Sequence, residues 1–163
     1  MSSKPKTTLR SARPKPATAP VGQGRRQDWP TRLFEFIEAR REVAFEWGRQ
    51  DCCLFVCDGI LTITGLDPAA KLYRGKYRDA LGAARLLKKH GGVEALAEKV
   101  CTAHGFFELS TPLIAQRGDV LLLDTAAHGP ALGLCVGSQI AAAGPLGLTF
   151  SPVGVARRAW RVG

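Results

Sequence analysis

The stretch Trp47-Gly48-Arg49-Gln50-Asp51-Cys52-Cys53-Leu54-Phe55-Val56 decides the fold of this chain. It is a glycine-broken loop that leads into an apolar segment, which runs from Cys52 to Ile63 and stops at Gly65. Because this segment is apolar on nearly all sides, it predicts a central, buried helix. Cys52 then lies in the first turn, where the helix dipole and unpaired backbone N–H groups stabilise a thiolate and make it nucleophilic.

Helical spacing of apolar residues predicts three further helices around this segment. The first starts at Asp28-Trp29-Pro30, with Asp28 as its cap, and runs to Trp47, where Gly48 stops it. The other two cover residues 78–90 and 93–103, and each is followed by glycine.

Beyond residue 105 the pattern changes to short apolar strands separated by glycine-containing turns. Gly137-Ser138 predicts a two-residue hairpin connection, and Gly144-Pro145-Leu146-Gly147 predicts a longer one. Helices first and antiparallel strands second indicate an α+β fold. The expected strands are 119–123, 131–136, 139–143, 148–150 and 155–162.

Charge divides the chain into two parts. The formal net charge is +9, but residues 1–27 hold seven basic residues and no acidic one, which leaves only +2 for the rest. The first 28 residues also hold four prolines and little that could be buried. This composition predicts a basic, flexible arm (1–28) on a single domain (29–163). The arm either orders on an acidic protein surface or on nucleic acid, or it is a solvated tail.

The cysteine pattern argues against a metal site. Five cysteines in a chain without an export-signal pattern favour free thiols in a reducing compartment. The sequence holds no Cys-x-x-Cys pair and its three histidines are scattered, so we expect neither a metal nor a cofactor. No apolar run approaches the roughly 18 residues of a membrane helix, so we expect no membrane span.

Several motifs carry a resemblance to a known superfamily. Asp51-Cys52-x-x-Phe55-Val56 resembles the Asp-Cys-Ser-Gly-Phe-Val signature of the NlpC-type cell-wall peptidases, which are papain-like. Arg117-Gly118-Asp119-Val120-Leu121 resembles their Pro-Gly-Asp-Leu strand entry, and Ala131–Gly137 resembles their His-Val-Gly-Ile-Tyr-x-Gly strand. The whole region 29–162 is similar to a branch encoded among bacteriophage and prophage tail genes, through Trp47-Gly-x-x-Asp-Cys52 and the closing Arg158-Ala-Trp160-Arg among others.

The resemblance implies a papain-like fold, with the Cys52 helix packed on a small antiparallel sheet or barrel. It also implies attack of the Cys52 thiolate on an amide carbonyl of peptidoglycan. The family's general-base position falls on Ala131, which cannot accept a proton, and its third catalytic position falls in the apolar segment 140–143.

Two alternatives remain for a substitute base. His128 lies three residues before Ala131 and is either that base or an exposed loop histidine. Trp47 and Asp51 are expected beside Cys52 at the mouth of the helix, and Asp119 is expected to support the site.

These observations predict a structural or assembly protein of a phage tail tip or hub, with a degenerate cysteine-peptidase-like fold. It would be present in the bacterial cytoplasm during assembly and then in the virion tail, in contact with other tail proteins. The alternative is an active cysteine peptidoglycan peptidase or amidase that uses Cys52 and His128 during genome entry. A third alternative is nucleic-acid binding by the arm, which has no aromatic residue to stack on bases and would depend on phosphate contacts.

Overall fold

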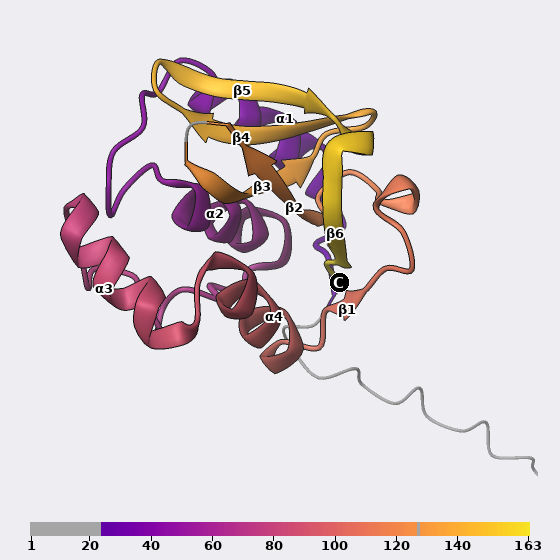
Figure 1. Cartoon of the computed structure of the whole chain (residues 1–163). Coiled ribbons are helices and arrows are strands. Elements are labelled where there is room, and N and C mark those ends of the chain that lie inside the picture. Colours follow the sequence, from indigo (N-terminus) through magenta and orange to yellow (C-terminus); the bar gives the residue numbers. More distant parts are fainter. Residues whose placement is uncertain (1–23, 127) are drawn as a thin grey trace, which may run out of the picture.

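The computed structural model describes residues 24–126 and 128–163. Within these ranges four helices come first along the chain and the strands follow, so the predicted α+β class is confirmed (Figure 1). The helices are α1 (Trp29–Arg40), α2 (Cys52–Thr64), α3 (Ala80–His90) and α4 (Val93–Ala103). The strands are β1 (Phe107–Glu108), β2 (Val120–Thr125), β3 (Gly129–Cys135), β4 (Gln139–Gly144), β5 (Gly147–Pro152) and β6 (Ala156–Arg161), with two 3₁₀ helices, η1 (Pro112–Ile114) and η2 (Val153–Val155).

The strands form one antiparallel sheet in the order β1-β6-β2-β3-β4-β5. β2 and β3 lie at its centre, where Leu122 is opposite Leu132. β1 and β5 are the two edges, so hydrogen bonds do not close the described strands into a barrel. The prediction of a small antiparallel sheet is therefore confirmed, and the sheet is open.

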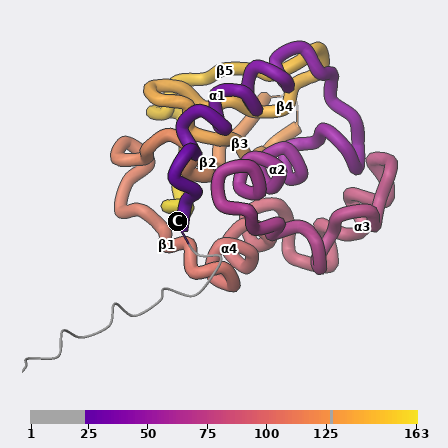
Figure 2. Tube along the Cα trace, turned by 180° about the vertical axis from the view of Figure 1, so that it is seen from behind, coloured from indigo at the N-terminus to yellow at the C-terminus, as the bar shows by residue number. Residues whose placement is uncertain are grey.

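The Cys52-bearing helix α2 is buried between this sheet and the other helices. It packs across β3 and beside α1 (Figure 2). The side chains of Phe55 and Ile63 have no exposed surface. Helix and sheet approach so closely that a Cβ at Gly59 would clash with Leu134 of β3. The all-round apolar pattern of α2 thus corresponds to a central core helix, as predicted.

The opposite face of the sheet carries a second, smaller apolar cluster. η1 and η2 contact each other, and η1 also contacts β6. Ala115, which follows η1, packs against the cluster. The buried members of the cluster are Leu109, Leu121, Leu123, Cys135, Ile140, Val153 and Ala159.

Helix α1 is shorter than its apolar pattern predicts, because it ends at Arg40 and not at Trp47. The backbone N–H of Phe45 donates to the carbonyl of Gly144 at 3.0 Å, and that of Leu148 donates to the carbonyl of Arg41 at 2.8 Å. Residues 41–45 therefore run along the β4–β5 hairpin. Hydrogen bonds to this hairpin replace helical ones, so tertiary contacts override the local pattern.

The folded domain begins a few residues before residue 28, where the sequence predicts the boundary between arm and domain. Arg25 approaches Asp119 Oδ1 at 2.7 Å and donates from Nε to the carbonyl of Val162 at 2.7 Å. The N–H of Arg26 donates to the carbonyl of Ile63 at 2.7 Å. These two arginines belong to the folded domain, and residues 1–23 of the predicted arm lie outside the described residues.

The hairpin connection at Gly137-Ser138 has two residues, as predicted: Cys135 is opposite Ile140, and the N–H of Val136 donates to the carbonyl of Gln139 at 2.8 Å. The connection from β4 to β5 is shorter than predicted, because only Pro145 and Leu146 form it, with Gly144 opposite Gly147. β1 and the two 3₁₀ helices were not predicted, since such short elements leave no periodic pattern. None of the helices in the described ranges is long and apolar enough to cross a membrane.

Candidate functional site

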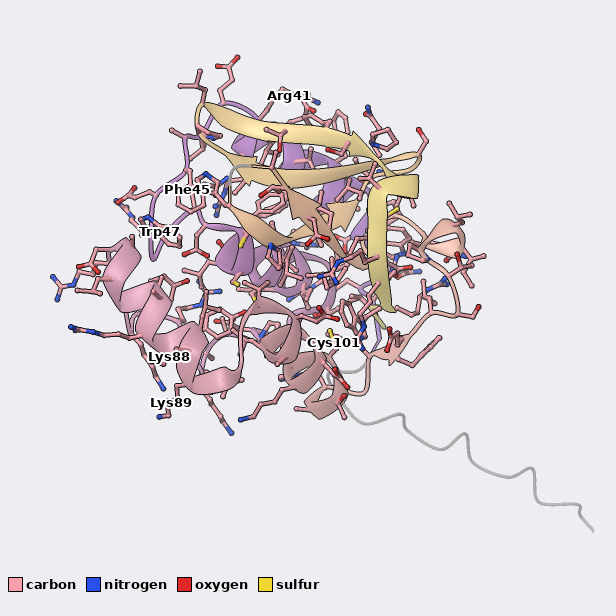
Figure 3. All side chains as sticks on the ribbon, in the orientation of Figure 1. Arg41, Phe45, Trp47, Lys88, Lys89 and Cys101 are labelled. Atoms are coloured by element: carbon pink, nitrogen blue, oxygen red, sulfur yellow. The ribbon has the colours of Figure 1, made fainter. Side chains whose placement is uncertain are left out.

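A cavity of about 700 Å³ lies at the N-terminus of α2. Its walls come from that terminus, from α3 and α4, from the start of β3 and from the β4–β5 hairpin. Phe45 and Trp47 lie side by side on the loop before α2, with ring centroids 4.7 Å apart (Figure 3). The lining is mostly apolar: Phe45, Trp47, Cys52, Cys53, Ala83, Leu86, Leu87, Val93, Leu96, Ala126, Pro130, Ala131, Ala143, Gly144 and Pro145, with Asp51, Tyr73, Tyr77, Thr125, His128 and Thr149 as the polar members.

Asp51 fixes the start of α2 and with it the position of Cys52. One oxygen of its buried carboxylate accepts the N–H of Leu54 at 2.9 Å, which caps the helix. The other oxygen accepts the N–H of Gly48 at 2.9 Å and the hydroxyl of Tyr77 at 2.6 Å. Cys52 is therefore held at the first residue of the helix, as the sequence predicts.

The environment of Cys52 favours its thiolate. The Cys53 thiol lies 4.0 Å from the Cys52 sulfur, and a hydrogen bond from it lowers the pKa of Cys52. Burial opposes this shift, and the backbone of Leu132 and Cys53 near the sulfur lowers the pKa further. The net pKa of Cys52 is below its ordinary value, as expected for a thiol at a helix N-terminus.

The other four cysteines differ from Cys52 in both exposure and acidity. All four are buried, whereas Cys52 is half-buried. The pKa of Cys53 is raised well above its usual value, because its thiol donates to Cys52 and because it is buried. Burial raises the pKa of Cys57 and of Cys101 to about 12, and it also raises the pKa of Cys135. Cys52 is thus the one cysteine of this chain with nucleophilic character.

Four of the other predicted site residues line the same cavity as Cys52: Trp47, Asp51, His128 and Ala131. Ala131 is on β3, the strand on which α2 packs, and it lines the cavity together with Cys52. His128 lies in the β2–β3 turn with an exposed side chain, and its backbone N–H donates to Thr125 Oγ1 at 3.2 Å. The cavity is thus lined by the Cys52 thiol, by the methyl group of Ala131, at the position that the resemblance gives to the general base, and by His128 of the β2–β3 turn.

Asp119, the remaining predicted site residue, is not brought to the cavity. Its carboxylate has no exposed surface and pairs with Arg25 at 2.7 Å and with Arg161 at 2.9 Å. It precedes the start of β2, whereas the last residue of that strand, Thr125, lines the cavity. The strand length separates the two ends by about 20 Å. The expectation that Asp119 supports the site is therefore wrong; it anchors the N-terminal segment and the last strand.

Sequence reasoning missed several residues of the cavity wall. Tyr73 and Tyr77 both reach it, and the Tyr73 hydroxyl lies 2.6 Å from the Cys57 sulfur. Ala83, Leu86 and Leu87 form the side of α3 that faces the cavity. Their i, i+3, i+4 spacing marks an apolar helix face, but such a pattern does not indicate whether the face meets protein or an open space. The described residues contain no group of three or more histidine, cysteine or acidic side chains placed to hold a metal ion.

A protein family described as a domain of unknown function (DUF6950) matches residues 24–162. The chain belongs to this family. The match begins at Gly24, next to the docked Arg25, and so spans the folded part of the chain together with its cavity. No curated protein matches the chain.

Proposed function

We propose that this chain is a bacteriophage or prophage tail protein with a structural or assembly role and a degenerate papain-like thiol site. The observation that carries the proposal is the methyl group of Ala131, which lines the same cavity as Cys52 at the position that the resemblance gives to the general base. Amide hydrolysis requires a group that protonates the leaving amine and then activates water. A methyl group can do neither.

The rest of the proposal follows from the resemblance to tail-encoded proteins. A domain that keeps the nucleophile position but lacks the base serves as a scaffold in contact with other tail proteins. On this view the bacterial cytoplasm is where the chain is made and the virion tail is where it acts.

The proposal is tested with the phage or prophage that encodes the chain. We expect Cys52→Ala to leave the number of assembled tails and the infectivity unchanged. Deletion of the gene should abolish both. Normal tails with a hundredfold loss of infectivity in Cys52→Ala would contradict an assembly role and indicate that the thiol acts chemically.

A second candidate function is an active cysteine peptidase or amidase on peptidoglycan. It is favoured by the presence of His128 on the same cavity as a thiol whose pKa is lowered. In this reading His128 is the general base. The conformation of the β2–β3 turn, or a movement of that turn, brings its imidazole to Cys52.

Incubation of the full-length protein with muropeptides separates the two candidates. The assembly protein releases no cleaved stem peptide. The peptidase releases stem peptides, and Cys52→Ala and His128→Ala each remove that activity, while Cys101→Ala, a cysteine outside the cavity, keeps it.

A further inference from the structure

We propose that the cavity binds an apolar acyl chain and that Cys52 carries this chain as a thioester, formed by transfer from an acyl thioester such as an acyl-coenzyme A. The inference rests on the Cys52 site described under the proposed function. It assigns that site a ligand class and a covalent step that need no general base.

The first argument is the apolar lining of the cavity. α3 turns Ala83, Leu86 and Leu87 toward it, and only Ala83 of this helix is buried by protein. Phe45 and Trp47 of the loop before α2 form another part of the wall. Apolar side chains that face an open space are stabilised when an apolar ligand displaces water from them. At about 700 Å³ the cavity is in the range of sites that hold ligands of ordinary cofactor or lipid size.

The second argument is the position of the thiol beside a hydrogen-bond donor. Cys52 lies in the cavity wall and is the first residue of α2. The N–H of the next residue, Cys53, is in the first turn and has no acceptor further back in the helix, so it is a donor for the oxygen of a carbonyl carbon bonded to this sulfur. It stabilises the negative charge that develops on the oxygen during acyl transfer.

The chemical step is an exchange between a thiol and a thioester. The Cys52 thiolate adds to the acyl carbonyl carbon, and a new carbon–sulfur bond forms. The resulting oxyanion collapses, the carbon–sulfur bond to the leaving thiol breaks, and that thiolate takes a proton from solvent. No atom changes its oxidation state, and no water molecule is consumed.

The third argument is the absence of a base at Ala131. A thiolate leaves without a proton, unlike an amine, so the exchange proceeds without a general acid. Hydrolysis of the new thioester does require activation of water, which the Ala131 methyl group cannot provide. The alanine at position 131, which cannot support peptidase chemistry, therefore also allows the acyl-cysteine to persist.

The test uses the full-length protein with dodecanoyl-coenzyme A below its micelle concentration and intact-protein mass spectrometry. We expect one dodecanoyl adduct per chain, removed by neutral hydroxylamine and absent from Cys52→Ala. Cys101→Ala should keep the adduct, because that buried cysteine lies outside the cavity wall. No adduct on the wild-type protein, or an equal adduct on Cys52→Ala, overturns the inference.

A chain-length series tests whether the cavity recognises the acyl group. Each additional methylene moved from water into the cavity should favour binding about fourfold. Octanoyl- and dodecanoyl-coenzyme A should therefore label far faster than acetyl-coenzyme A, and Leu86→Glu should slow the dodecanoyl reaction more than the acetyl reaction. Equal rates for acetyl and dodecanoyl donors on the wild-type protein would show simple thiol reactivity and overturn the proposed binding, whether or not the Leu86 variant folds.

The result of this labelling test can be distinguished from the result of the test of the proposed function. Cleavage of muropeptides contradicts the degenerate site but does not prevent adduct formation from being measured. A protein that cleaves nothing and forms no adduct contradicts only the acyl-chain inference.

Discussion

The hydroxyl of Tyr77 donates a 2.6 Å hydrogen bond to the buried carboxylate of Asp51, the residue that caps the Cys52-bearing helix α2. Burial and this hydrogen bond raise the pKa of Tyr77 well above its usual value. The contact links the segment between α2 and α3 to the start of α2. Tyr77 and Asp51 also line the cavity, so the same pair sets the position of the thiol.

Removal of this hydroxyl should destabilise the protein. Tyr77→Phe loses a hydrogen bond to a charged group, and we expect the free energy of unfolding in urea to fall by about 1.5–3 kcal/mol. Tyr73→Phe is the matched control, because the Tyr73 hydroxyl contacts the uncharged Cys57 thiol. This control should lose about 0.5–1.5 kcal/mol. An equal loss in both variants would argue against a special role of the Asp51 contact.

A side chain at Gly48 should destabilise the protein. It has φ +78°, and a Cβ there would clash with the carbonyl of Tyr77. Gly75 has a similar φ of +75° but nothing within 4 Å of its Cβ position, so it serves as the control. Both alanine variants carry a conformational cost of about 1–2 kcal/mol. Gly48→Ala should lose about 1–3 kcal/mol more through overpacking, measured by chemical denaturation. Equal stability of the two variants would contradict the close approach of Tyr77.

Cys52 should be the one cysteine that reacts in the native protein. Its pKa is lowered, so its thiolate fraction rises at a lower pH than that of a free cysteine, and its alkylation at neutral pH should be correspondingly faster. The rate of iodoacetamide labelling from pH 5 to 9, with free cysteine measured alongside, gives the midpoint. We expect this midpoint below that of free cysteine. Labelling of all five cysteines in denaturant is the control, and a midpoint above that of free cysteine would refute the assignment.

Arg25 should contribute strongly to stability although it precedes the first helix. Its guanidinium pairs with Asp119, donates to the carbonyls of Arg117 and Val162 and lies 4.3 Å from the centre of the Trp29 ring. Arg25→Ala leaves the buried Asp119 with Arg161 as its remaining cation, and we expect a loss of about 2–4 kcal/mol.

The matched control for Arg25 is Arg32, which forms an exposed pair with Asp28 at 2.8 Å. In thermal unfolding of both variants, Arg32→Ala should lower the melting temperature far less than Arg25→Ala, because an exposed ion pair contributes little to stability. Equal melting temperatures of the two variants would show that Arg25 does not anchor the domain.

Local sequence features predicted much of the fold because they depend only on neighbours along the chain. The all-round apolar segment after Asp51 forms α2, and α4 spans residues 93–103 as its pattern predicts. Where a segment meets partners far away in sequence, the prediction was wrong. The segment 41–45 bonds to the β4–β5 hairpin instead of continuing α1, and Arg25 pairs with Asp119 instead of belonging to an arm.

For the candidate site, the sequence by itself determined that Cys52 lies in the first turn of α2, since the start of a helix depends on residues close together in the chain. It could not determine the cavity, whose walls come from segments between residues 45 and 149. Only the tertiary structure brings Ala131 of β3 into the cavity wall with Cys52 and places Asp119 at the other end of β2. The acidity and surroundings of the thiol are non-local quantities, and so they were decided by packing and not by the local pattern.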